Sequence, residues 1–226
     1  MKKILVMLLI LVSLSITAFA DVADNHGYEA DAPSPWAAAA VDTAIKNQLV
    51  PESLQRNYRE SITREQFCEL AFELLWRNND EAASFGVIES AFPDTDSIQV
   101  NYLHYLGIID GRADWSRGLG YHIVFEPEAP IHRQEAAKIL DKIYDILIPN
   151  EERSEAPTVV YTDDAEIEDW ARGYVYSITN RGIMNGSGKF EINGVEYNPF
   201  GPYEGYTVEQ AIVTMQRLEM QMPLNS

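Results

Sequence analysis

The chain has 226 residues and a formal net charge of −18, with 17 Lys and Arg against 35 Asp and Glu. A field of this sign repels nucleic acid and anionic lipid, so we expect neither as a partner, and local cations must hold any anionic ligand. The only cysteine, Cys68, excludes an internal disulfide. Its place beside Phe67 and Ala71 on a predicted helix favours a buried, inert thiol over a nucleophile.

The first 20 residues have the pattern of an export signal. Two lysines precede an apolar run over residues 4–17, and a small-x-small cleavage site comes next at 18–20. We therefore predict a signal peptide over 1–20 and an N-terminal segment over 21–32. The alternative is a membrane anchor, but the run is too short to span a bilayer comfortably. We expect a secreted protein with no membrane span after cleavage.

Three later segments share one pattern, in which a helix, an apolar pair and a loop are followed by a second helix. The second helices begin after Thr63, His132 and Thr207, spaced 69 and 75 residues apart. Thr63 with Gln66, and Thr207 with Gln210, predict capping boxes. Apolar residues recur at helical spacing behind each start, so each helix has one stripe that needs a partner.

The first helices of these segments are shorter or less regular. We expect them over residues 36–48, 97–106 and 170–181. Gly107 and Gly182 suit the left-handed residue that ends a helix, whereas Gln48 at the corresponding place needs another solution.

The loops between the paired helices differ from one another. Residues 189–197 predict a short hairpin that turns at Asn-Gly, and residues 111–130 predict an enlarged irregular loop. The predicted divisions are repeats over 33–78, 91–148 and 158–220, with an acidic linker over 149–157.

At these residues the chain resembles the S-layer homology family. That family's repeat has Phe-x-Asp, a Trp-Ala helix start, an apolar pair before x-Gly, and Ile-Thr-Arg-Ala-Glu at the second helix. The matching positions are Phe92 to Asp94, Tyr161 to Asp163, Trp36-Ala37, Trp170-Ala171, Gly111, Gly186, Ile62 to Glu65, and Ile131 to Arg133. The resemblance implies a mainly α fold, in which three tandem helix-loop-helix repeats form a pseudo-threefold, three-pronged module with short β-hairpin elements.

The same resemblance implies a function at the cell wall or cell surface. Such modules bind secondary cell-wall polysaccharide noncovalently in grooves between the prongs, and we expect that glycan to be acidic or pyruvylated. Another surface protein is a further candidate partner. The alternative is a structural or protein-interaction module that kept the fold without glycan binding.

Arginines at two of the three second-helix starts are candidate glycan contacts. Arg64 and Arg133 stand where free helix amides and a guanidinium could together grip a carboxylate. The alternative is an exposed surface Arg near Glu side chains, although the helix dipole disfavours a cation there. Val208 takes this position in the third segment, so we predict weak or no binding of acidic glycan there.

The remaining candidates each have a structural alternative. Trp36 and Trp170 could stack on a sugar or belong to the core. Asp94 and Asp163 could hydrogen-bond sugar hydroxyls or cap the following helices. The predicted glycan-binding set is Arg64, Arg133, Trp36, Trp170, Asp94, Asp163, Gly111 and Gly186.

Catalytic patterns are missing from the sequence. There is no Gly-x-Ser-x-Gly, P-loop or dinucleotide fingerprint, and the four histidines show no metal-ligand spacing. A calcium loop that starts at Asp94 fails, because Gln99 and Tyr105 occupy its required Gly and Glu positions. We expect no enzyme activity, cofactor or metal.

Overall fold

The computed structural model describes residues 31–79, 89–114, 122–149, 151 and 157–222. The chain divides into two compact units, Met1–Ala32 and Pro33–Ser226. The predicted signal peptide lies outside the described residues, as does nearly all of the predicted N-terminal segment. Every described helix and strand belongs to the second unit. In the described ranges, no helix is both long and apolar enough to cross a membrane.

The described part of the second unit is mainly helical, which confirms that prediction. Its six α-helices are α1 (Ala38–Lys46), α2 (Arg64–Asn78), α3 (Ile98–Tyr105), α4 (Arg133–Leu147), α5 (Asp169–Asn180) and α6 (Val208–Glu219). Two antiparallel hairpins join strands β1 (Arg112–Asp114) with β2 (His122–Val124), and β3 (Phe190–Ile192) with β4 (Val195–Tyr197).

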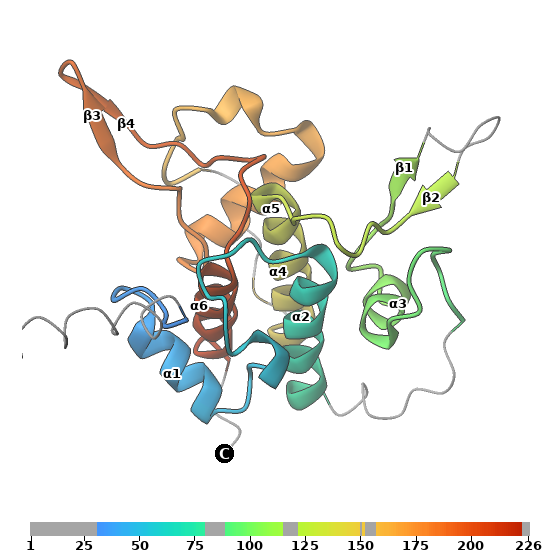
Figure 1. Cartoon of the computed structure of the whole chain (residues 1–226). Helices are drawn as coiled ribbons and strands as arrows, with labels where there is room; N and C mark the ends of the chain where they lie inside the picture. The colour runs from blue at the N-terminus through green and yellow to red at the C-terminus, as the bar shows by residue number, and fades with distance from the viewer. Residues whose placement is uncertain (1–30, 80–88, 115–121, 150, 152–156, 223–226) are drawn as a thin grey trace, which may run out of the picture. The chain divides into compact units, whose positions relative to one another are not determined.

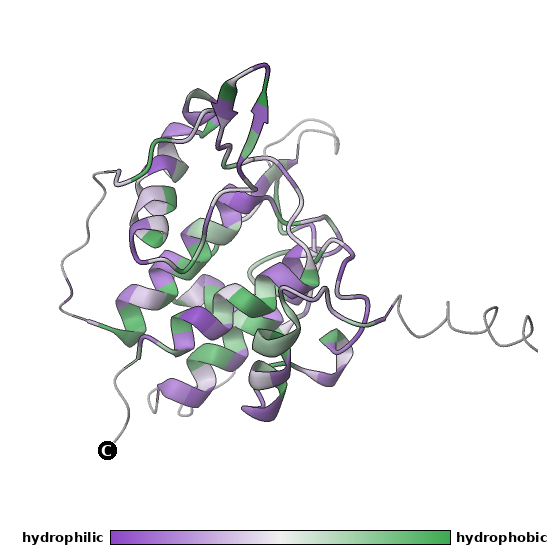
Figure 2. Ribbon diagram, turned by 90° about the vertical axis from the view of Figure 1, so that its left-hand side faces the viewer, coloured by the Kyte–Doolittle hydropathy of each residue, from purple (hydrophilic) through white to green (hydrophobic). Residues whose placement is uncertain are grey.

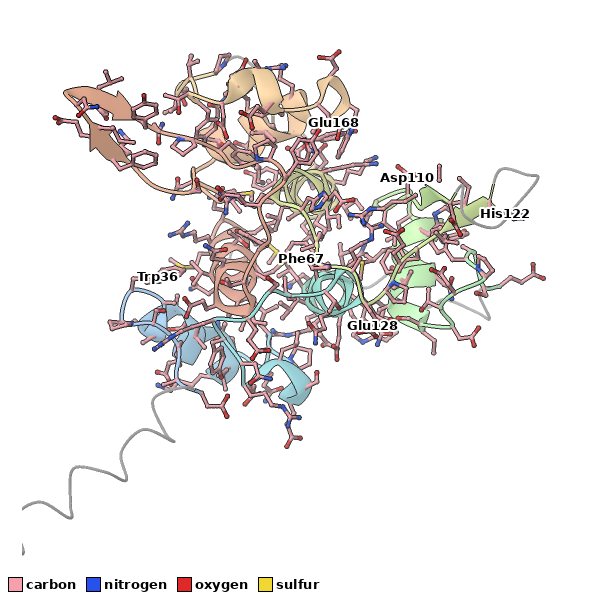
Figure 3. The ribbon with its side chains drawn as sticks, turned by 45° about the horizontal axis from the view of Figure 1, so that its top comes forward. Trp36, Phe67, Asp110, His122, Glu128 and Glu168 are labelled. Atoms are coloured by element: carbon pink, nitrogen blue, oxygen red, sulfur yellow. The ribbon has the colours of Figure 1, made fainter. Side chains whose placement is uncertain are left out.

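Three helices, α2, α4 and α6, contact one another (Figure 1). Each also contacts one of the remaining helices: α3 packs on α2, α5 on α4, and α1 on α6. Phe67 of α2 is fully buried close to α6, with its ring 6.2 Å from that of Tyr206 (Figure 3). The helices mix hydrophilic and hydrophobic residues (Figure 2), and the buried apolar ones form one core.

The segments that precede α2, α4 and α6 hydrogen-bond to one another. Single bridges join Ser61 with Thr207, Thr63 with Pro130, and His132 with Gly205. The first two amides of each helix donate to backbone carbonyls of a neighbouring segment. The accepting residues are Ala129 and Pro127 for α2, Glu204 and Pro202 for α4, and Glu60 and Tyr58 for α6.

The helix starts therefore lack the free amides that we expected for a ligand, and that expectation is wrong. Side chains satisfy the next amide at two of them. Thr63 accepts from the Gln66 amide at 3.2 Å, and Thr207 accepts from the Gln210 amide at 3.3 Å. The Gln side chains return the bond in both cases, which confirms the two capping boxes.

The ends of the first helices also share one pattern. Gly107 and Gly182 adopt left-handed φ angles of 68° and 69°, as predicted. Gln48 solves the same problem by adopting φ 59° itself. In all three places the next amide, of Leu49, Ile108 or Ile183, donates to the carbonyl five residues earlier.

The hairpin predicted over 189–197 is present. Asn193 and Gly194 both have positive φ, 52° and 79°, as a type I′ turn between β3 and β4 requires. The loop over 111–130 was expected to be irregular, but it contains the paired strands β1 and β2, in which Arg112 faces Val124. Each of these strands has three residues, which is too few for an alternation of apolar and polar residues to be recognised in the sequence.

Candidate functional site

A groove of about 670 Å³ opens beside the N-terminal ends of α2 and α4. Its walls come from three places that are distant in sequence: the segment that leads into β1, the first turns of α4, and the start of α5 with Tyr203. Asp110 and Glu168 belong to two of these walls (Figure 3). The groove thus joins parts of all three predicted repeats.

Arg64, at the first position of α2, lies in the floor of this groove and is only 5% exposed. Its Nε donates to the carbonyl of Phe125 at 2.8 Å and its Nη2 to that of Asp110 at 3.3 Å. The guanidinium also lies 4.7 Å from the centre of the Phe125 ring. Burial lowers the pKa of Arg64. The alternative of an exposed surface Arg is wrong, because Arg64 is buried and ties α2 to the segment around β1 and β2.

Glu135, in the first turn of α4, forms salt bridges with two arginines of the groove. Its carboxylate accepts from Arg64 Nη1 at 2.7 Å, from Arg112 Nη2 at 2.6 Å, and from the amide of His132 at 3.0 Å. Burial raises the pKa of this carboxyl, but Arg64, Arg112 and the His132 amide lower it more, so the pKa lies below its usual value. The carboxylate is therefore ionised and holds two guanidinium groups together.

Arg112, the first residue of β1, was not among the predicted site residues. It donates to Glu135 through Nε and Nη2 and to Glu126 through Nη1 at 2.6 Å. Unlike Arg64 it keeps 27% of its side chain exposed. Its only sequence signal was its place directly after Gly111, and an arginine in a loop of unassigned structure has no partner that the sequence could name.

The far side of the groove carries an aromatic pair and a lysine. Trp170 is 44% exposed and Tyr203 is 51% exposed. Glu168 accepts from Trp170 Nε1 at 2.6 Å and from the Tyr203 hydroxyl at 3.0 Å, and these hydrogen bonds lower its pKa. Lys138 of α4 lies 5.8 Å from the centre of the Trp170 ring and pairs with Asp110, whose pKa its hydrogen bond lowers. Trp170 is thus at the surface and not in the core.

Arg133 has the surroundings of Arg64 on a different pair of segments. It is 4% exposed, and its Nε and Nη2 donate to the carbonyls of Phe200 at 2.8 Å and Asn185 at 2.6 Å. Val208, which takes this place on α6, is 4% exposed and belongs to the core. The two arginines and the valine therefore all fill buried positions.

The aspartates of the predicted set bind backbone and not the following helices. Asp94 accepts from the amides of Phe125 and Glu126, both at 2.8 Å. Asp163 accepts from the amides of Phe200 and Gly201, both at 2.7 Å. The capping alternative is wrong. Ser97, and not Asp94, caps α3, and the Asp163 side chain makes no capping bond to the short 3-10 helix Asp164–Glu166 that follows it.

The remaining predicted residues divide between packing and surface. A Cβ on Gly111 would lie 2.6 Å from Phe92 and one on Gly186 would lie 2.6 Å from the carbonyl of Pro199, so both glycines permit close packing. Of the two, Gly111 also lines the groove. Trp36 is 56% exposed and is not among the residues that line the groove.

Among the described residues, no three His, Cys, Asp or Glu side chains gather as a metal site would require. Cys68 is buried, which confirms that part of the prediction, and burial raises its pKa to about 12. The groove contains aromatic faces, paired ions and a few exposed polar groups, a composition that is typical of binding sites.

No family model matches the sequence. Over 171 residues the chain is 25% identical to an amylopullulanase of Thermoanaerobacterium thermosulfurigenes. The match covers 74% of this chain and 8% of that protein, so the chain corresponds to a small part of this distant relative.

Proposed function

We propose that the described unit consists of three S-layer homology repeats and binds secondary cell-wall polysaccharide noncovalently, without catalysis, on an exported protein. The repeat assignment is supported by the cyclic order of contacts. The helix amides of 33–78 bond to 91–148, those of 91–148 to 158–220, and those of 158–220 back to 33–78. Equivalent bonds in the same cyclic order are what a pseudo-threefold module of three tandem units requires.

One observation carries the binding proposal: the groove presents half-exposed Trp170 and Tyr203 beside the cations Arg112 and Lys138. Aromatic faces cover the apolar side of a sugar ring, while charged groups hydrogen-bond its hydroxyls and carboxylates. On a chain of net charge −18, the lining of this groove balances three cations against three carboxylates, so the groove itself adds no net negative charge that would repel an anionic ligand.

Trp170 provides the sharpest test. Cosedimentation with wall sacculi, before and after the secondary polysaccharide is stripped, measures binding by the protein without its signal peptide. We expect binding only to unstripped sacculi, and Trp170→Ala to weaken it about two- to tenfold, the effect of one aromatic contact. Trp76→Ala is the matched control, since Trp76 is 43% exposed on α2 and outside the groove.

A second candidate function is a protein-interaction module without glycan binding. The exposed apolar residues Phe190, Ile192 and Val195 on the β3–β4 hairpin favour it, because they share one face of the hairpin. Pelleting with neither form of sacculi would support this candidate and contradict the first.

A further inference from the structure

The groove holds as many cations as anions before any ligand arrives. Its lining contains Arg64, Arg112 and Lys138 against Asp110, Glu135 and Glu168. Glu126 is not among the lining residues, but it adds a further carboxylate by accepting from Arg112, which is one of them. A carboxylate of a ligand therefore cannot simply add to this site; it has to take the place of one that the protein already supplies.

Glu126 is the carboxylate best placed to be displaced. Its side chain is 42% exposed and makes one bond to Arg112, whereas Glu135 is 16% exposed and bonds two arginines and a backbone amide. Arg64 is excluded as the exchange partner, because each of its three guanidinium nitrogens already donates inside the fold and its side chain is only 6% exposed.

The backbone at Glu126 is anchored by a neighbouring segment. Asp94 holds the Glu126 amide at 2.8 Å, and the residue has a left-handed φ of 59°. Only the side chain has to rotate away, and it rotates towards solvent, where its charge is hydrated. Arg112 would then present Nη1 to the groove while Glu135 still fixes the rest of its guanidinium.

We propose that Arg112 is the residue that selects an acidic glycan, and that the Glu126 carboxylate occupies the place of the ligand's carboxylate until the two exchange. This inference rests on the proposed function and names the residue by which the groove distinguishes acidic from neutral polymer. The ligand class is a polysaccharide with carboxylate substituents. A guanidinium held on one side and free on the other suits a single carboxylate.

The test uses the acidic polysaccharide released from wall sacculi and the same polymer after chemical reduction of its carboxyl groups. Calorimetry with the protein without its signal peptide gives the affinity for each. We expect Glu126→Gln to tighten binding of the acidic polymer about tenfold, typical of a hydrogen bond to a charged group that no longer has a competitor. Arg112→Ala should weaken it at least about tenfold. Neither change should alter affinity for the reduced polymer.

Glu128→Gln is the matched control, because it removes the same charge from an exposed residue of the same segment (Figure 3). Equal tightening by both Gln variants would overturn the role of Arg112 and show a response to net charge alone. Should Arg112→Ala fail to fold, the comparison of the two Gln variants still decides. Wild-type binding with no preference for the acidic polymer overturns this inference and leaves the proposed function standing; no binding of either polymer overturns both.

Discussion

Arg64 shows how one side chain can belong to the fold and to a site at once. It touches the groove, yet its guanidinium lies on the Phe125 ring and its donors are taken by two carbonyls and Glu135. Arg133 has the same kind of place, over the rings of Phe200 and Tyr206. Replacing both arginines would therefore test folding before it tested binding.

The first prediction concerns Arg64→Ala. Truncation leaves Glu135 with one arginine fewer, and removes the donor from the buried Phe125 carbonyl and from the Asp110 carbonyl, so the free energy of unfolding should fall by about 3–5 kcal/mol. Chemical unfolding followed by circular dichroism measures it. The exposed Arg56, which donates to the Ser53 carbonyl at 3.5 Å, is the control, and Arg56→Ala should cost less than about 0.5 kcal/mol. Equal costs would contradict the buried role of Arg64.

Cys68 provides a second prediction at this scale. The thiol is 1% exposed and burial raises its pKa to about 12, so thiolate is scarce at neutral pH and reagent cannot reach it. A thiol reagent such as dithiobis-nitrobenzoate should label the folded protein only as fast as it opens, and should label it at once in denaturant. Rapid stoichiometric labelling without denaturant would be incompatible with this burial.

At the scale of elements, the segment before α6 consists of a peripheral hairpin and a buried anchor. Phe190 and Tyr197 stack on each other at 5.4 Å on the hairpin, and Phe190 is 49% exposed. Phe200, three residues after the hairpin, is fully buried. The Arg133 guanidinium lies over its ring, and its amide donates a hydrogen bond to the Asp163 carboxylate. The hairpin can change without the core, whereas the anchor cannot.

The third prediction compares these two phenylalanines. Phe200→Ala should lower the free energy of unfolding by about 3–5 kcal/mol, because it leaves a cavity in the core. Phe190→Ala should change it by less than about 0.5 kcal/mol, because the ring is half in water already. Urea unfolding of the pair gives both values. A large loss for Phe190→Ala would mean that the hairpin is packed more tightly than its exposure indicates.

For the whole molecule, charge decides how stability depends on pH. The folded-state pKa of Glu135 is lowered, so this carboxyl stabilises the fold above its unfolded pKa of about 4.3 and loses that contribution as pH falls through the folded pKa. Neutralising the many surface carboxylates relieves repulsion over the same range, which opposes the loss. The two effects can be separated only by comparing variants.

The fourth prediction is that Glu135→Gln flattens the acid limb of the stability profile. The wild type should lose stability below about pH 4.3 more steeply than the variant, and the variant should be the less stable protein at pH 7. Denaturant midpoints measured from pH 3 to 8 provide the comparison. Parallel profiles for the two proteins would show that ionised Glu135 does not stabilise the fold.

By itself, the sequence determined the secondary structure well. The Thr63 and Thr207 capping boxes, the helix ends at Gly107 and Gly182, and the Asn-Gly hairpin all depend on contacts within a few residues. The residues that make such contacts are close together in the sequence, so the conformational preferences of residue types are enough to predict them.

Only the tertiary structure decided what the site residues touch. The partners of Arg64 lie 46 to 71 residues away, and those of Asp94 lie 31 and 32 residues away, so no local pattern names them. Arg112 was missed for the same reason, since its role depends on Glu135 from another segment. Burial and charge pairing are set by which surfaces meet when the three segments pack, and that depends on long-range contacts that residue type alone does not specify.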